Sequence, residues 1–392
     1  IAIPHNSNGS NGQMFEMENW EGLPISTQYA EFRMRNEPIV EMTQVKGTSE
    51  THPILSPDDE WADFEIMWQR IGNSIYSRPF GSYVRQAYLD GLGMDEEGRG
   101  NPYKFGMVGA SDTHTGAISD DESDFHSKIG IFDGTPVGRG SVPISDEQVE
   151  TLTGGQDIRQ LSFKKVGGRN FNNTIFNTWG ASGLAAVWAE ENTRDSIFDA
   201  FRRKETYATS GSRIKLRFFA GYDLDEINLS KDDLIKEAYK KGVPMGQDLA
   251  ASQGKAPSFL IWAMRDKNAA PLQRVQIIKG WVEKNSGRPF EEVIDVACSD
   301  GLLPDPSTKR CPDNEALVDI SDCSISSDRG ANEIKTIWTD DSFDSSMKSF
   351  YYVRVLENPS CRWSTWDAIK NGTKPREDLQ PTIQERAWSS PI

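Results

Sequence analysis

Histidine, cysteine and long apolar runs are all scarce in this sequence. It has four histidines and four cysteines in 392 residues, and no stretch approaches the 18 or so apolar residues that a membrane helix requires. Basic residues are also few, because 43 Lys and Arg stand against 59 Asp and Glu, a formal charge of −16. Binding to a nucleic-acid backbone needs a basic surface, so no nucleic-acid partner is expected.

The cysteines are all late in the chain and none forms a Cys-x-x-Cys pair, so no zinc ribbon or redox motif is predicted. An even number in one loop-rich region favours two disulfides, most simply Cys298–Cys311 and Cys323–Cys361. Three connectivities are open, and four buried thiols in a cytosolic protein are the alternative. Disulfides predict a periplasmic or secreted protein.

Aromatic residues are plentiful, with 11 Trp, 18 Phe and 10 Tyr, which is typical of a folded chain. The length favours two domains. Residues 1–211 alternate strand-like and helical stretches, whereas residues 212–392 show alternating strands split by turns, typical of an antiparallel β-sandwich. We expect helices at 61–71, 83–92 and 193–204, and strands at 1–3, 39–42, 105–109, 214–219, 258–263, 274–279 and 350–355.

Two short segments hold the residues with the strongest chemical signal. His5 follows the apolar residues 1–3, and Asp112 and His114 follow the strand-like run 105–109. In an extended strand, a spacing of two puts Asp112 and His114 on one face, where they can converge on a metal ion. Imidazole and carboxylate together suit zinc, manganese or iron. A turn or a hydrogen-bonded pair is the alternative.

Five strings in the sequence resemble the bacterial DUF3604 proteins, which we place as a branch of the PHP (polymerase and histidinol phosphatase) superfamily of metal-dependent hydrolases. They are IPHN (3–6), VEMTQVKG (40–47), GASDTHTG (109–116), GLAAVWAEENTR (183–194) and QERAWSSPI (384–392). The resemblance implies an α/β fold, the C-terminal part of a distorted PHP-type (β/α)7 barrel, followed by the β-sandwich-like domain. It assigns His5 to the late metal-binding histidine of the superfamily, and Asp112 and His114 to its final Asp-x-His.

The same resemblance implies ligands that this chain does not contain. PHP proteins also use an N-terminal His-x-His, and no His-x-His occurs here. We therefore expect a C-terminal fragment, whose site is completed by an N-terminal portion of the same protein. The expected cofactor is a divalent transition metal (Mn, Zn or Fe), with two or more ions in the complete protein.

Two further residues are candidates for catalysis. Lys46 follows the strand that carries Glu41, and it would bind an anionic group or developing charge unless it is a solvated edge residue. His52 lies in the next loop as a general acid or substrate contact, with an exposed structural histidine as the alternative. The predicted function is hydrolysis of an anionic small molecule, a phosphoester foremost, by metal-activated water. The alternatives are a carbamate, ester or amide hydrolase, or a non-catalytic secreted binding protein on a hydrolase scaffold.

Overall fold

The computed structural model describes residues 1–126, 128–154, 156, 162–252 and 254–392, and three sheets dominate these residues. The six-stranded sheet contains, in spatial order, β12 (Pro289–Cys298), β11 (Leu272–Val282), β16 (Lys348–Glu357), β19 (Arg386–Ser389), β7 (Thr206–Thr209) and β6 (Leu184–Val187). The four-stranded sheet contains β15 (Glu333–Thr339), β10 (Ser258–Met264), β8 (Lys215–Gly221) and β9 (Gly242–Pro244). The three-stranded sheet contains β2 (Gly47–Thr48), β1 (Ile39–Gln44) and β3 (Gly106–Gly109).

Short ribbons and helices complete the described structure. The ribbons pair β4 (Phe163–Val166) with β5 (Arg169–Asn172), β13 (Val318–Asp319) with β14 (Ser324–Ile325), and β17 (Ser360–Cys361) with β18 (Thr382–Ile383). The α-helices are α1 (Thr27–Asn36), α2 (Val84–Glu96), α3 (Asp146–Thr153), α5 (Arg194–Arg202), α6 (Leu234–Lys241) and α7 (Trp363–Lys370). The 3-10 helices are η1 (Ser7–Gly9), η2 (Glu122–Asp124), η3 (Ile175–Thr178) and η4 (Leu224–Glu226). None of the described helices has the length and apolar character that a membrane crossing demands.

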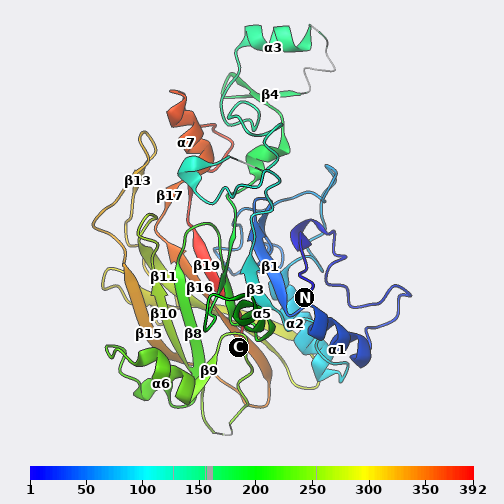
Figure 1. The fold of residues 1–392 in the computed structure, drawn as a ribbon, viewed down its shortest axis with the longest axis vertical. Helices are drawn as coiled ribbons and strands as arrows, with labels where there is room; N and C mark the ends of the chain where they lie inside the picture. Colours follow the sequence, from blue (N-terminus) through cyan, green and yellow to red (C-terminus); the bar gives the residue numbers. More distant parts are fainter. Residues whose placement is uncertain (127, 155, 157–161, 253) are drawn as a thin grey trace.

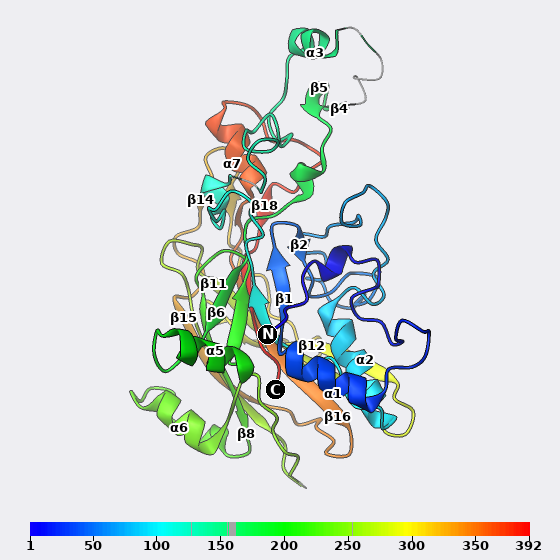
Figure 2. The same cartoon turned by 45° about the vertical axis from the view of Figure 1, so that its right-hand side comes forward.

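The six-stranded sheet lies at the centre, with a hydrophobic core on each face (Figure 1). Successive side chains of β16 alternate between the two cores, as strand geometry requires. Val353 and Val355 pack towards the four-stranded sheet, and Phe350 and Tyr352 pack towards α2 and the three-stranded sheet. Figure 2 shows α1 and α2 on one side of β16 and α6 on the other. The packed antiparallel sheets agree with the sandwich expected for the later part of the chain.

The expected barrel is not found among the described residues, whose sheets are mostly antiparallel and do not close. Of the described strand pairs, β1 with β3 is the parallel one. The chain between these strands contributes α2 and long loops, and the chain after β3 enters loops and ribbons before β6. β6 and β7 then join the sheet that residues after 211 mainly build. The domain boundary at residue 211 stays a prediction.

Two of the three expected helices are confirmed. Residues 83–92 lie within or next to α2, and residues 193–204 contain α5, which Thr193 caps by accepting a hydrogen bond from Ser196 N (3.3 Å). The helix expected at 61–71 is wrong, since this segment forms turns. The Asp59 carboxylate accepts a bond from Trp61 N (3.0 Å), and Glu65 has a φ of 44°, which a right-handed helix excludes.

The expected strands from 39 onward are present as β1, β3, β8, β10, β11 and β16. The strand expected at residues 1–3 is wrong. This segment is held beside the three-stranded sheet through single bonds, from Ala2 N to Asn36 O (2.7 Å) and from Glu41 N to Pro4 O (3.1 Å). Ile1 and Ile3 are exposed, so the two apolar side chains do not enter the core that a buried strand would require.

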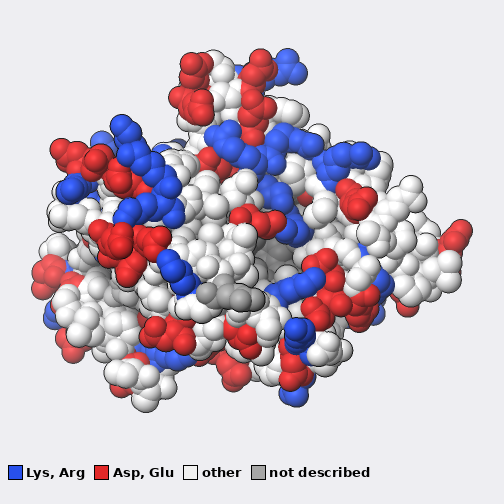
Figure 3. Space-filling view, turned by 90° about the horizontal axis from the view of Figure 1, so that it is seen from below, with Lys and Arg blue, Asp and Glu red and all other residues white. Residues whose placement is uncertain are grey.

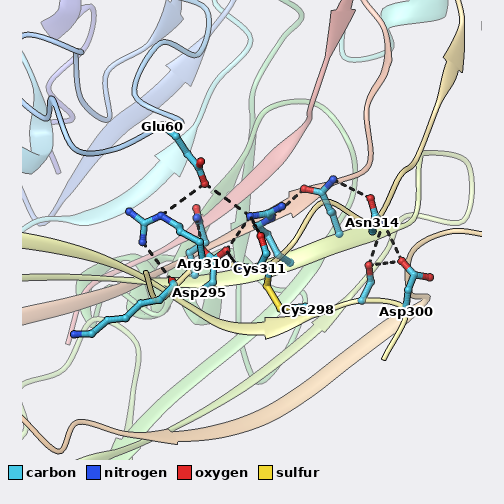
Figure 4. Close-up of a disulfide and its surroundings, with 12 residues drawn as sticks. Glu60, Asp295, Cys298, Asp300, Arg310, Cys311 and Asn314 are labelled. Atoms are coloured by element: carbon cyan, nitrogen blue, oxygen red, sulfur yellow. Dashed lines mark hydrogen bonds and ion pairs between the residues drawn. A yellow bond between two sulfur atoms is a disulfide. The ribbon is translucent and has the colours of Figure 1, made fainter. Parts of the chain in front are cut away.

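Both expected disulfides are formed, Cys298–Cys311 and Cys323–Cys361. Figure 4 shows the first among charged groups that fix its loop. Asp295, on β12, accepts bonds from Cys311 N (2.7 Å) and from a guanidinium nitrogen of Arg274 (2.9 Å). Two disulfides agree with a location outside the cytoplasm.

Candidate functional site

The candidate site lies where β1 and β3 end. These strands are parallel, so their carboxyl ends meet at one edge of the three-stranded sheet. Lys46 follows β1, Asp112 and His114 follow β3, and the loop that carries His5 runs against β1. The structure therefore brings His5, Lys46, Asp112 and His114 together from three separate segments.

A buried carboxylate on β1 orients His5. His5 Nδ1 lies 2.7 Å from Glu41 Oε2, and Glu41 Oε1 accepts a bond from Asn6 N (3.2 Å). Glu41 is only 4% exposed, whereas the His5 side chain is 45% exposed, so the buried carboxylate holds an imidazole that solvent can reach. Because Nδ1 is engaged, Nε2 is the nitrogen that faces the site, 3.7 Å from Asp112 Oδ1. A carboxylate behind an imidazole is the usual support of a metal-binding histidine.

Gln44 fixes the loop that carries His5 to the turn that carries Lys46. Its Nε2 donates to Asn6 Oδ1 (2.7 Å), and its Oε1 accepts from Lys46 N (2.8 Å). Asn8 adds a second tie by donating to Lys46 O (3.0 Å). Asn6 adopts a left-handed φ of 57°, a conformation that asparagine tolerates better than most residues. The two segments therefore form one hydrogen-bonded unit.

Asp112 is the centre of the cluster. Its Oδ1 lies 3.4 Å from His114 Nε2, and its Oδ2 forms ion pairs with the ammonium groups of Lys46 and Lys128. Asp112 has a φ of 52°, so the expectation that Asp112 and His114 share one face of a strand is wrong. A left-handed turn after β3 brings the two side chains together instead.

Both lysines are buried at the site. Lys46 lies in the turn between β1 and β2, and burial followed by the neighbouring Lys128 lowers its pKa to about 6, whereas the negative charge of Glu41 acts in the opposite direction. Burial also lowers the pKa of Lys128. The positive charge of Lys128 is the main cause that lowers the pKa of His114, which favours the neutral imidazole that binds metals.

Lys128 is the residue that sequence reasoning missed. The buried Asp133 accepts bonds from the backbone N–H groups of Lys128 (3.1 Å), Ile129 (3.0 Å) and Gly130 (2.7 Å), and so shapes the loop that presents the lysine. Lys128 O also accepts a bond from His114 N (2.8 Å). Three N–H groups that donate to an aspartate three to five residues away make no recognisable sequence motif, so the sequence did not point to this lysine.

His52 lies apart from the cluster. Its Nδ1 accepts a bond from Ile54 N (3.1 Å), its ring packs against Tyr83 with centroids 5.5 Å apart, and burial lowers its pKa. Among the described residues, no hydrogen bond or ion pair joins it to His5, Asp112 or His114. Its catalytic role stays a prediction.

The donor types fit part of a metal site. Two ligands about 2.1 Å from a tetrahedral ion lie about 3.4 Å apart, close to the 3.4 and 3.7 Å between Asp112 Oδ1 and the two imidazole nitrogens. A complete site is not formed, because no group of three or more His, Cys, Asp and Glu side chains in the described part of the chain has the geometry to hold an ion. The second oxygen of Asp112 faces ammonium groups instead.

The cluster is thus a polar site of imidazole, carboxylate and ammonium groups at the ends of parallel strands. The family described as "Protein of unknown function (DUF3604)" matches residues 1–392, so the chain belongs to this family. No curated protein and no solved structure matches the chain. The wider relationship to the PHP superfamily stays a prediction.

Proposed function

We propose that this protein is a metal-dependent hydrolase of the PHP type, active on an anionic small-molecule ester, a phosphoester foremost, in the periplasm or outside the cell. The observation that carries the proposal is the convergence of His5, Asp112 and His114 next to two buried lysines. Active sites of α/β folds gather at the carboxyl ends of parallel strands, which is where this cluster lies.

In this proposal His5, Asp112 and His114 hold a divalent transition ion, with further ligands from an N-terminal portion of the protein. When bound, such an ion would lower the pKa of its water to about 7. Glu41 keeps His5 Nδ1 engaged, so that Nε2 is the free donor. Lys128 favours a neutral His114.

Lys46 and Lys128 supply the binding of the anionic substrate. Both ammonium groups meet at Asp112 Oδ2 and are largely removed from water, where a charge interaction is stronger than at the surface. A bound phosphoryl group favours the protonated form of both lysines, and the two ammonium groups then stabilise the negative charge that develops during hydrolysis. A carbamate or carboxylic ester would be attracted less strongly by the two lysines, because it carries less negative charge.

The test is made on the product of the complete coding sequence. We expect at least one tightly bound Mn, Zn or Fe per chain and hydrolysis of p-nitrophenyl phosphate. Asp112→Ala should lose at least one equivalent of metal and reduce hydrolysis at least 100-fold. The matched histidine variants are His114→Ala, with the same expected losses, and His126→Ala, whose exposed side chain faces Asp124 and should be neutral.

Lys46→Met separates the substrate step from the metal step. It should retain metal while the KM for p-nitrophenyl phosphate rises at least 10-fold. A metal-free protein without hydrolysis of phosphate, carboxylate or carbamate esters would instead support a binding protein, and it would end the proposal. Full metal content in Asp112→Ala would show that the site lies elsewhere.

A further inference from the structure

A cavity lies at the end of β3 opposite to the candidate site. It occupies about 490 Å³ and is lined by the residues just before β3 and by edges of the two larger sheets, among them Phe105, Lys204, Leu249, Phe259, Phe343 and Tyr351. Figure 3 views the molecule from this end and shows a hollow near the centre, with basic side chains beside it. The candidate site follows β1 and β3, whereas this cavity precedes β3, so the two are separate.

The cavity has the character of a small-molecule site. Its volume falls within the range of about 300–1,000 Å³ that such sites occupy. Aromatic side chains from α2, β10, β16 and the segment just before β3 are among the residues that line it, together with three lysines and two aspartates. A ligand with an apolar body of one or two rings, or a short chain, fits this space.

Two of the three lysines that line the cavity are paired with aspartates. Lys104 Nζ donates to Asp248 Oδ2 (2.5 Å), and Lys348 forms an ion pair with Asp95. Among the described residues, neither a hydrogen bond nor an ion pair engages the ammonium group of Lys204. The other two lysines of the lining each pair with an aspartate, so Lys204 is the one without a charged partner among the described residues. An apolar cavity with one uncompensated cation is complementary to an anion.

The backbone at Lys204 is held in an unusual conformation. α5 ends in a Schellman motif, in which Lys204 N donates to Phe201 O (3.1 Å) and Glu205 N donates to Ala200 O (3.1 Å). Lys204 occupies the left-handed position of this motif, with φ 62°, where glycine is usual. A non-glycine residue is disfavoured in this conformation, because its Cβ crowds the backbone. A ligand-binding role of the Lys204 side chain would explain why a lysine occupies this unfavourable conformation.

Two glycines make room for this lysine. A Cβ added at Gly246 would lie 2.6 Å from Lys204 Cβ, and one added at Gly106 would lie 2.8 Å from it, both too close. Burial is the main cause that lowers the pKa of Lys204 to about 8, with Lys104 acting in the same direction and Asp248 against it. The ammonium group is therefore costly to leave unpaired.

We propose that this cavity binds a small amphipathic molecule with an apolar body and one anionic group, a carboxylate or sulfonate, which pairs with Lys204. The apolar body lies against the aromatic side chains. This site does not depend on the metal site, and a failure of either leaves the other intact.

The test uses two dyes that share an aromatic body. 1-Anilinonaphthalene-8-sulfonate carries a sulfonate, and N-phenyl-1-naphthylamine does not. Both should bind the full chain, detected by fluorescence titration. Lys204→Gly should weaken binding of the sulfonate dye at least 10-fold and change binding of the neutral dye less than twofold. Leu249→Trp, which fills the cavity, should weaken binding of both.

Lys309→Gly is the matched control, because Lys309 also has a left-handed φ (56°) but pairs with Glu292 outside the cavity lining. It should leave both affinities unchanged. Lys204→Gly should keep or raise the melting temperature, since glycine suits this backbone; if it fails to fold, Lys204→Asn replaces it. Unchanged sulfonate-dye affinity in the Lys204 variant overturns the proposal, as does dye binding that survives Leu249→Trp, which would indicate adventitious binding only.

Discussion

Arg354 is the centre of a buried ion network, and replacing it with methionine should cost the protein much of its stability. Its guanidinium group donates to Asp59 Oδ1 (2.7 Å), to both oxygens of Glu50 (3.1 and 3.2 Å) and to Gln276 Oε1 (2.8 Å), and its exposure is 0%. Arg85 binds the same two carboxylates from α2. The network joins the loop after Lys46 to the central sheet.

The magnitude follows from what remains after the substitution. Arg85, Tyr352 OH and Trp388 Nε1 still donate to Glu50, but two buried carboxylates then share one guanidinium group. Each hydrogen bond to a charged group contributes about 1.5–3 kcal/mol, and such values do not add within a network. Breaking a buried ion pair by removing one partner costs about 3–5 kcal/mol, which is the loss we expect for Arg354→Met.

The dependence on pH provides a second criterion. Burial alone would raise the pKa of Glu50 and Asp59, but the guanidinium groups of Arg354 and Arg85 outweigh it and hold both pKa values below their usual range. A carboxylate with a lowered folded-state pKa stabilises the fold above its unfolded pKa, and that stability is lost as pH falls further. The difference between wild type and Arg354→Met should therefore shrink below about pH 4.

Urea unfolding followed by tryptophan fluorescence measures both effects. Arg329→Met is the control, since Arg329 forms an exposed pair with Glu315 (3.4 Å), and it should change the free energy of unfolding by less than about 0.5 kcal/mol. A loss below about 1 kcal/mol for Arg354→Met at pH 7 would refute the reasoning. So would an equal loss at pH 7 and pH 3.

Two further predictions concern the disulfides and the buried acids. Replacing both cysteines of Cys298–Cys311 with alanine should destabilise the protein by about 3 kcal/mol, and replacing both cysteines of Cys323–Cys361 by about 4 kcal/mol, because the bonds close loops of 13 and 38 residues. Mass spectrometry should find four alkylated cysteines only after reduction. Thiols that react before reduction would contradict the prediction. Burial raises the pKa of Glu385 to about 8, and the neighbouring Glu357 adds to the rise. A raised folded-state pKa means that stability falls as pH rises from about 5 to about 8, with a slope of about 1.4 kcal/mol per pH unit. Glu385→Gln should reduce the slope in urea titrations across that range by about 1.4 kcal/mol per pH unit and leave the contribution of Glu357, whose pKa burial also raises to about 8. The exposed Glu377→Gln should leave the slope unchanged, and identical slopes in both variants would exclude Glu385 as a contributor.

The predictable part of the fold rests on local patterns. The strands β10 and β16 are strongly apolar, and α5 has a threonine N-cap followed by a helical apolar face, so their identity is fixed by nearby residues. The segment 61–71 has a similar composition but forms turns, because Asp59 engages arginines from α2 and β16. Arg85 and Arg354 lie 26 and 295 residues from Asp59 in the sequence, so no local sequence pattern could reveal these contacts.

The candidate site also has a part that the sequence could predict and a part that it could not. His5, Asp112 and His114 were recognisable by residue type and spacing, although a left-handed turn, rather than a strand face, brings the last two together. The ion pairs of Lys46 and Lys128 with Asp112 could not be predicted, because they depend on how the turn after β1 and the loop around Asp133 meet. The candidate residues were therefore visible in the sequence, and the ion pairs that surround Asp112 were not.

Lys204 shows why a correct secondary-structure prediction can hide a candidate ligand-binding residue. In the sequence, Arg202, Arg203 and Lys204 form a basic end to a helix, a pattern that the helix dipole explains completely. In the structure, α5 ends at Arg202 and Lys204 takes the left-handed position that follows the helix cap. Its side chain lines the cavity. A dipole contribution needs neither the strained backbone nor the burial, and both are accounted for when the lysine holds an anionic ligand.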